Sequence, residues 1–277
     1  MTPLLLALVL NGPPQNVDPA QAPAATSVDA KAPADDLEID PVEPDFVVVN
    51  LPTTARLPKG KFVFRVTHRF SDGLSSGDFG DLAANLFSLD GGAQTGLELR
   101  YGLLRGTQLW IHRTSDRTIA FHVTQGLLRQ GGAPLSLQLD LSIEGLDNFG
   151  EEYSPRVGVT LSRKLGERAA LYLAPAFVGN TNLFAPDQDN SSVVLGVGGR
   201  LRLTGSMSLL AEAHPRVAGY DGNGDPLVAF GIEGRVGGHC FQFNVGNDLG
   251  TTPAQLARGH IGPNDWFLGF NISRKFY

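Results

Sequence analysis

The sequence predicts an all-β protein: a closed, antiparallel, up-and-down transmembrane β-barrel of about twelve strands. Three observations predict it. Segments of roughly ten residues alternate apolar and polar side chains, and this is the length at which a tilted strand crosses a bilayer. Tight turns and long loops alternate in connecting these segments. The last segment, residues 265–277, carries aromatic residues at both ends, as barrel strands do at the two membrane interfaces.

Composition agrees with a β-rich membrane protein. Charged residues are 18% of the 277 residues, below the roughly 25% of soluble domains. The formal charge of −6 is concentrated in residues 1–46, where eight acidic residues face only Lys31, so the remainder is about neutral. No basic surface is left to attract nucleic acid. Cys240 is the only cysteine, which excludes a disulfide framework and a cysteine-based metal site, and no cofactor is expected.

The N-terminal 45 residues are expected to lie outside the barrel. Residues 1–24 are predicted to be a signal peptide, because the apolar run 3–10 is too short for a membrane helix and Ala22-Pro23-Ala24 suits cleavage. Residues 25–45 are rich in Pro, Ala and Asp, a composition typical of a disordered acidic linker.

Residues 46–59 form a lead-in to the barrel. They are apolar at first and are then broken by Pro52 and Pro58, which excludes a central strand because proline cannot donate to a ladder. We expect an ordered segment that lies on, or partly inside, the barrel mouth as a partial plug. The barrel itself is predicted over residues 60–277.

Twelve segments of the barrel region alternate with a period of two. The clearest is 134–144, where five Leu or Ile residues alternate with Ser, Gln and Asp. The predicted strands are 61–70, 95–104, 107–115, 118–127, 134–144, 155–164, 169–178, 192–204, 206–214, 227–236, 239–248 and 265–277.

The connections also follow a pattern. The tight turns are 105–106, 130–133, 165–168, 205 and 237–238, and the long loops are 71–94, 145–153, 179–190, 215–226 and 249–264. If both termini lie in the periplasm, every tight turn is periplasmic and every long loop is external, with 116–117 as the one short external link. A soluble β-sandwich explains the alternation but not this asymmetry. The expected location is therefore the outer membrane of a Gram-negative-type bacterium, with its lipid bilayer as partner and the oligomeric state open.

Alternation assigns polar side chains of both signs to the interior of the barrel. Twelve strands lie between eight, which side chains fill, and sixteen, which leave an open channel. The predicted lumen-lining residues are Glu98, Arg100, His112, His122, Asp140, Arg156, Arg200, Arg202, Glu212, His214, Glu233, Arg235, Gln242, Asn244, Asn271 and Lys275.

Two weaker candidates for chemistry remain. Asp221, Asn223 and Asp225 place oxygen ligands at alternate positions, as a calcium loop does, but an EF-hand needs Gly and Glu where Pro226 and Ile232 stand. A polar glycine-rich external loop is the favoured alternative. No histidine spacing indicates a metal site, and no nucleophile, base and orienting group come together, so no enzyme is predicted.

Several short motifs also resemble a known family. They are VTHRF at 66–70, GDFGD at 77–81, RT at 117–118, LRQ at 128–130 and GFNISR at 269–274. Together they resemble an uncharacterised bacterial β-barrel family, known as a domain of unknown function, from about Leu51 to the C-terminus. The resemblance implies a barrel and an exported location. It implies no activity, so no functional residue is carried over from it.

Two functions stay open at this stage. The first is a narrow channel or transporter for small polar solutes, which the inward charges favour because such groups need water or an opposite charge. The second is a non-conducting surface or scaffold barrel whose loops or N-terminal segment bind a partner. The acidic tail and the lead-in favour the second, since residues 46–59 would obstruct the periplasmic mouth.

Overall fold

The computed structural model describes residues 39–75, 77–87, 89–182, 190–220, 225–259 and 265–277. The chain divides into two units, Met1–Pro33 and Ala34–Tyr277, and the first lies wholly outside the described residues. The predicted signal peptide, most of the predicted linker, and Asp221 and Asn223 of the calcium candidate also lie outside them.

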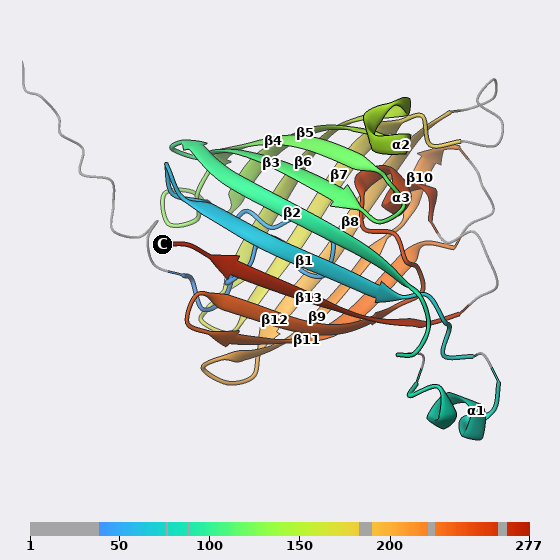
Figure 1. Cartoon of the computed structure of the whole chain (residues 1–277). Coiled ribbons are helices and arrows are strands. Elements are labelled where there is room, and N and C mark those ends of the chain that lie inside the picture. The colour runs from blue at the N-terminus through green and yellow to red at the C-terminus, as the bar shows by residue number, and fades with distance from the viewer. Residues whose placement is uncertain (1–38, 76, 88, 183–189, 221–224, 260–264) are drawn as a thin grey trace, which may run out of the picture. The chain divides into compact units, whose positions relative to one another are not determined.

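Within the described residues, twelve strands pair antiparallel with their neighbours and close into a ring (Figure 1). Ring closure is made by β1 and β13, which pair from Val63 with Lys275 to Arg69 with Gly269. An open sheet would leave unpaired backbone groups in lipid, where each costs several kcal/mol. The predicted barrel is thus confirmed. Its strands are β1 (Phe62–Phe70), β2 (Ala93–Leu104), β3 (Thr107–Thr114), β4 (Ile119–Leu128), β5 (Ser136–Gly145), β6 (Glu151–Leu165), β7 (Ala169–Gly179), β8 (Ser191–Arg202), β9 (Met207–His214), β11 (Leu227–Val236), β12 (His239–Gly246) and β13 (Phe267–Lys275).

A further strand, β10 (Arg216–Gly219), is additional to the ring. It pairs with β8 beyond the point where β9 stops. Pro215 separates β9 from β10, and its carbonyl accepts the Leu195 N–H at 2.9 Å. β10 therefore extends β9 past a proline, which has no N–H to give to the ladder. The sequence pattern predicts a loop at this position.

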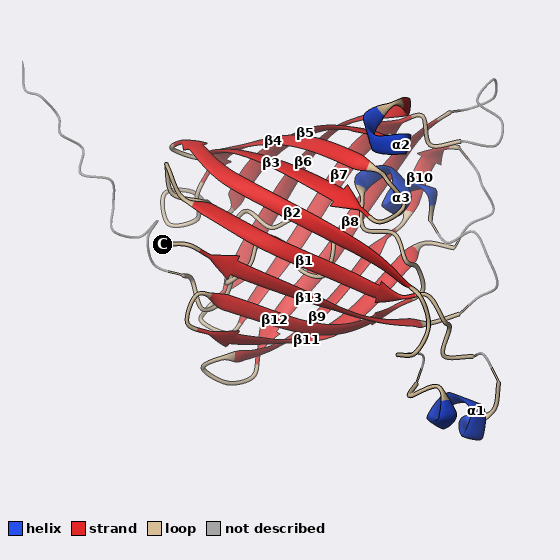
Figure 2. Ribbon diagram, in the orientation of Figure 1, coloured by secondary structure: helices blue, strands red, loops and turns tan. Residues whose placement is uncertain are grey.

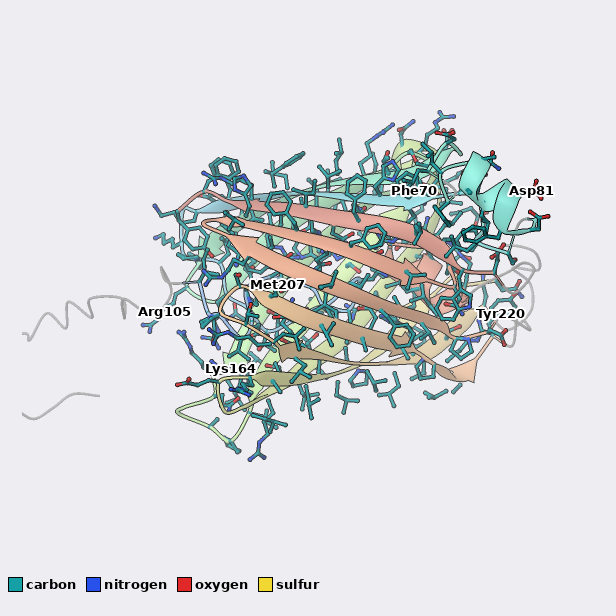
Figure 3. The ribbon with its side chains drawn as sticks, turned by 90° about the horizontal axis from the view of Figure 1, so that it is seen from below. Phe70, Asp81, Arg105, Lys164, Met207 and Tyr220 are labelled. Carbon is teal, nitrogen blue, oxygen red and sulfur yellow. The ribbon has the colours of Figure 1, made fainter. Side chains whose placement is uncertain are left out.

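Tight turns and long loops lie at opposite ends of the barrel (Figure 2). Figure 3 labels Arg105, Lys164 and Met207 at the tight-turn end, and Phe70, Asp81 and Tyr220 at the other. The helices α1 (Phe79–Ala84), α2 (Leu146–Phe149) and α3 (Pro253–Arg258) all lie in connections at the long-loop end. In the described part of the chain, none of the helices is long and apolar enough to cross a membrane.

The barrel is apolar outside and polar inside. On β2, Leu97 and Leu99 are 51% and 49% exposed, whereas Glu98 and Arg100 on the other face are 2% and 3% exposed. The same alternation continues around the ring. A soluble sandwich buries its apolar face, so the outer surface of this barrel is suited to lipid.

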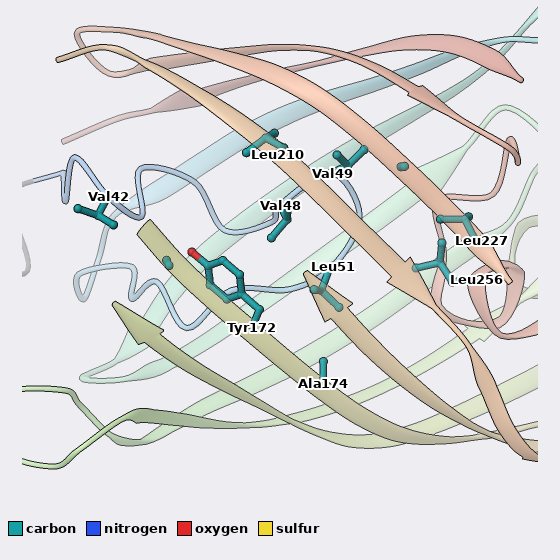
Figure 4. Packing of buried hydrophobic residues seen from close by; sticks show 11 residues of the cluster. Val42, Val48, Val49, Leu51, Tyr172, Ala174, Leu210, Leu227 and Leu256 are labelled. Atoms are coloured by element: carbon teal, nitrogen blue, oxygen red, sulfur yellow. The ribbon is translucent and has the colours of Figure 1, made fainter. Parts of the chain in front are cut away.

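Residues 39–60, which we call the inner segment, run inside the ring (Figure 4). Val48, Val49 and Leu51 are buried and pack against the inner faces of β7, β9 and β11. Leu51 fits against β8 because Gly196 and Gly198 lack side chains, and a Cβ there would lie 2.4 and 2.7 Å from its methyl groups. The main apolar core of this protein is therefore inside the barrel.

The ordered part of the N-terminus begins earlier than the sequence indicates. The predicted linker runs to residue 45, but Val42 and Asp45 are buried in the structure. Asp40 pairs with Lys164 on β6 at 2.5 Å. Of the acidic residues that suggested a solvated tail, Asp40 and Asp45 find donors in the barrel wall, namely Lys164 of β6 and Ser273 of β13.

The polarity of the outer face generates a prediction. Phe243, in the middle of β12 and 52% exposed, should face lipid near the bilayer midplane. Phe243→Arg should lower the free energy of unfolding in lipid vesicles by about 2–4 kcal/mol, measured by denaturant titration. Val236→Arg, beside a tight turn, is the matched control and should cost no more than about 1 kcal/mol. Equal costs for the two variants would contradict a lipid-facing position for Phe243.

Candidate functional site

Glu212 is the main contact between the barrel wall and the inner segment. Its carboxylate accepts the backbone N–H groups of Val49 at 2.8 Å, Asn50 at 2.9 Å and Leu51 at 2.9 Å. Three consecutive N–H groups around one carboxylate form a compact anion cradle. Residues 49–51 thereby satisfy their N–H donors without pairing with a strand of the ring.

The carbonyl groups of the inner segment find donors on other strands. Arg200 on β8 donates to Val47 O at 3.0 Å, Gln242 on β12 to Val48 O at 2.8 Å, and Asn271 on β13 to Val49 O at 2.8 Å. On the opposite side, Gln108 of β3 donates to Ala55 O and Gln138 of β5 to Thr53 O. The segment is therefore held from all sides of the lumen.

Charged side chains of the lumen pair with one another. Arg200 and Glu233 lie 3.0 Å apart and are almost fully buried. Glu98 pairs with both Arg65, at 2.5 Å, and Arg100, at 3.1 Å. Buried charges are tolerated only when paired in this way.

The helix α3 occupies part of the lumen at the long-loop end, beside β7 and β8. The carboxylate of Glu144 accepts the Thr252 hydroxyl at 2.8 Å and the Ala254 N–H at 2.9 Å, so it caps the start of α3. Ala254 and Ala257 then pack against Val178 and Val194 of the wall. The lumen is thus occupied from both ends, by α3 and by the inner segment.

The predicted lumen residues differ in how deeply they are buried. Arg156, Arg202 and Arg235 are half-buried, and Arg202 contacts the tight turns through the carbonyls of Thr204 and Glu167. The other predicted residues are buried on the inner face: Glu98, Arg100, His112, His122, Asp140, Arg200, Glu212, His214, Glu233, Gln242, Asn244, Asn271 and Lys275. That they line a path for solutes stays a prediction.

Sequence reasoning missed several residues of this interior. Arg65, Arg69 and Glu144 lie on the polar faces of their strands, so alternation alone was sufficient to find them. The sequence at α3 also contains a pattern that is typical of the start of a helix. Thr252 and Gln255 form a capping box, and Pro253 stands at the first helical position.

One group of potential metal ligands exists within the described residues. Ligand atoms of Asp45, Glu233 and Cys240 lie within 4.8 Å of one another. Arg200 pairs with Glu233, and Lys275 donates to the neighbouring Pro44 carbonyl, so two cations balance the two carboxylates. The cluster has no excess negative charge with which to hold a metal ion. Of the calcium candidate, only Asp225 is described.

Two of the three carboxylates of the inner segment, Glu43 and Asp40, have opposite pKa shifts. Burial raises the pKa of Glu43 above its ordinary value, and Arg200 only partly offsets this. Burial is also the largest single influence on Asp40 and acts to raise its pKa. The hydrogen bond and charge of Lys164 and the N–H groups of Val42 and Glu43 together outweigh burial and hold that pKa below its ordinary value. Glu43 accepts the Thr54 N–H at 3.1 Å, so both carboxylates belong to the contacts that keep the segment in place.

The fold is shared with solved porins and channels. A KdgM porin superposes with a TM-score of 0.52 at 9% identity, over 78% of this chain and 99% of that chain. The COG4313 outer membrane channel from Pseudomonas putida F1 gives 0.51 at 13% identity, over 79% and 97%. A NanC porin gives 0.51 at 8% identity, over 78% and 99%. At these identities the likeness establishes the barrel fold alone.

Sequence comparison with families is more specific. No curated protein matches this chain by sequence. Residues 45–276, almost the whole barrel together with most of the inner segment, match a family that is described as a membrane bound beta barrel domain of unknown function. The chain therefore belongs to the membrane bound beta barrel domain family DUF5777.

Proposed function

We propose that this protein is an outer-membrane channel for small polar solutes, with both termini in the periplasm, and that the inner segment is its gate. The observation that carries the proposal is how the segment is held. Its backbone is bound by side chains such as Glu212, Arg200 and Gln242, and residues 39–59 belong to no strand of the ring. At its end, beside β1, the Gly60 N–H donates to Gly102 O of β2 at 2.8 Å. The inner segment can therefore leave the lumen without breaking the hydrogen bonds that join the strands of the ring.

The wall behind the inner segment suits an aqueous path. Glu212, Arg200, Gln242 and Asn271 would face the lumen once the segment has left, and each can exchange its backbone partner for water. A ring of twelve strands is wider than the eight-stranded barrels that side chains fill completely. Porins and channels among the structures of the same fold support this function.

A non-conducting scaffold is the second candidate. It is favoured by one observation: α3, fixed by Glu144, occupies part of the long-loop end while the inner segment fills the other. A barrel occupied from both ends would act through its surface. The two functions differ in what happens when the inner segment is removed.

Deleting residues 25–59 should raise conductance in planar lipid bilayers, because it removes the segment and leaves the twelve strands intact. Glu212→Ala in the full chain should increase the open probability, since three N–H groups lose their acceptor. Glu167→Ala, on an exposed tight turn, is the matched control and should match the unaltered chain. If neither the full-length nor the truncated protein conducts, the channel proposal is wrong and the scaffold function is favoured.

Glu43 gives the gate a defined pH dependence. A raised pKa means that the docked segment prefers protonated Glu43, so this contribution to docking is complete at low pH and is lost as the pH rises through the raised pKa. Glu43→Gln should therefore strengthen docking at neutral pH, seen as slower hydrogen exchange of the amides in residues 46–55. Asp40→Asn is the contrasting variant and should speed exchange, because it removes the charge that pairs with Lys164. Faster exchange in the Glu43→Gln protein would refute this account.

Arg200 should influence ion selectivity in the truncated channel. Arg200→Gln leaves Glu233 without its ion-pair partner, with only the hydrogen bond from Gln242, and makes the net charge of the lumen more negative by one. The reversal potential in a salt gradient should therefore shift toward cation selectivity. The double variant with Arg202→Gln should shift it further, and a conducting channel whose reversal potential is unchanged would show that these residues do not line the path.

A further inference from the structure

We propose that the closed barrel binds a small monocarboxylate, of acetate to propionate size, in a cavity between the inner segment and α3. The site uses Arg65, Arg156 and His122 to bind the carboxylate, and residues of β7 to receive its alkyl group. It is a property of the closed state and stands whether or not the barrel conducts.

The cavity has a volume of about 60 Å³, and its walls come from the barrel, the inner segment and α3. A single water molecule needs roughly 10–15 Å³ on this scale, and a cavity that holds benzene has about 150 Å³. The space therefore suits a few water molecules or one small ion. It excludes sugars and other large solutes while the segment is docked.

One wall is rich in donors that lack partners. Nε and Nη1 of Arg65 and Nε1 of Trp110 are buried donors, and Nε2 of His122 is a buried ring nitrogen that donates in one of its two tautomers; none of them has a hydrogen-bond partner among the described residues. The hydroxyls of Thr124 and Thr251, on the same cavity, are likewise unpaired there. A buried polar atom without a partner costs about 1–3 kcal/mol, so their gathering around one space indicates that a bound species meets them.

The charge of this wall selects an anion. Three guanidinium groups, those of Arg65, Arg100 and Arg156, face two carboxylates, those of Glu98 and Asp140. Glu98 is shared between Arg65 and Arg100. Asp140 already accepts hydrogen bonds from Gln138 at 2.7 Å and Thr160 at 2.6 Å. One positive charge is left in excess, which a single carboxylate would balance.

The lining beside Arg156 is apolar, since Arg156 on β6 pairs in register with Val178 on β7. It consists of Ala174, Ala176 and Val178 on β7 together with Val194 of β8 and Leu256 of α3. Inorganic phosphate or chloride would gain nothing from this surface, whereas an alkyl group would bury its area against it. The two walls together therefore fit a carboxylate that carries one or two further carbon atoms.

Tryptophan fluorescence can report on the site directly. The chain has two tryptophans, so Trp266→Phe leaves Trp110, which stacks on the His122 ring at a centroid distance of 3.3 Å. Titration of the full-length Trp266→Phe protein with sodium acetate, at constant ionic strength in detergent, should give a saturable change in emission. Acetamide, the neutral counterpart, and phosphate should give none. Saturation-transfer NMR with acetate and with propionate provides a second readout that does not depend on Trp110.

Matched substitutions on one strand test the assignment. Arg156→Gln should weaken acetate binding about tenfold or more, as expected for the loss of a charge-assisted hydrogen bond. Arg163→Gln, also on β6 but on its exposed face, should bind within about twofold of the unaltered chain. Thr124→Val, which keeps the shape, should weaken binding without removing a charge.

Three outcomes would overturn the proposal. The first is no acetate binding by either readout, in which case water alone fills the cavity. The second is phosphate binding as tight as acetate, and the third is equal affinity of the Arg156→Gln and Arg163→Gln proteins. Each can be distinguished from failure of the proposed function, because conductance of the truncated chain is measured separately.

Discussion

The whole structure depends on the rule that a buried backbone N–H or C=O group must have a partner. In the barrel wall, hydrogen bonds between neighbouring strands satisfy every strand only if the ring closes. The pairing of β1 with β13 closes it. Inside the ring, residues 39–59 of the inner segment belong to no strand, so side chains supply many of their partners. Glu212 accepts three N–H groups, and Arg200 and Gln242 supply donors to the carbonyls. The polar side chains of the lumen thus supply the hydrogen-bond partners that the backbone of the buried inner segment needs.

Much of the fold could be predicted from the sequence because lipid imposes one environment on every outward side chain. Alternation on β2 and β5 placed Leu97 and Leu139 outside, and the order of tight turns and long loops fixed the up-and-down topology. The strand β10 was not predicted, since Pro215 ends the local pattern. What extends the pairing past Pro215 is the length of β8, a partner that no local pattern reveals.

The site was less predictable, because alternation identifies the face of a residue but not its neighbour. It placed Glu212 and Arg200 on the inner face, yet their partners lie more than 150 positions earlier, at Val49 and Val47. How far the inner segment enters the lumen depends on Gly196 and Gly198, because side chains there would collide with Leu51. The sequence alone does not show that Leu51 packs against these two glycines. Residues 249–264 were predicted as a long loop, although the capping box at Thr252 was enough to indicate a helix, and the place of that helix depends on Glu144, another distant contact.

The interior of the barrel is not uniformly polar, and its polar and apolar parts hold the inner segment in different ways. Charged residues such as Glu212 and Arg200 can exchange the inner segment for water at little net cost, since hydrogen bonds are traded for hydrogen bonds. Val48, Val49 and Leu51 cannot, because they pack on apolar parts of β7, β9 and β11, and exposing them costs about 25 cal/mol for each Å². The hydrogen bonds therefore position the segment, while the apolar contacts supply the cost of removing it. If the segment is the gate that we propose, opening needs a solute, a partner or a change of pH that favours the open state, and the size of that preference sets how far the equilibrium can move.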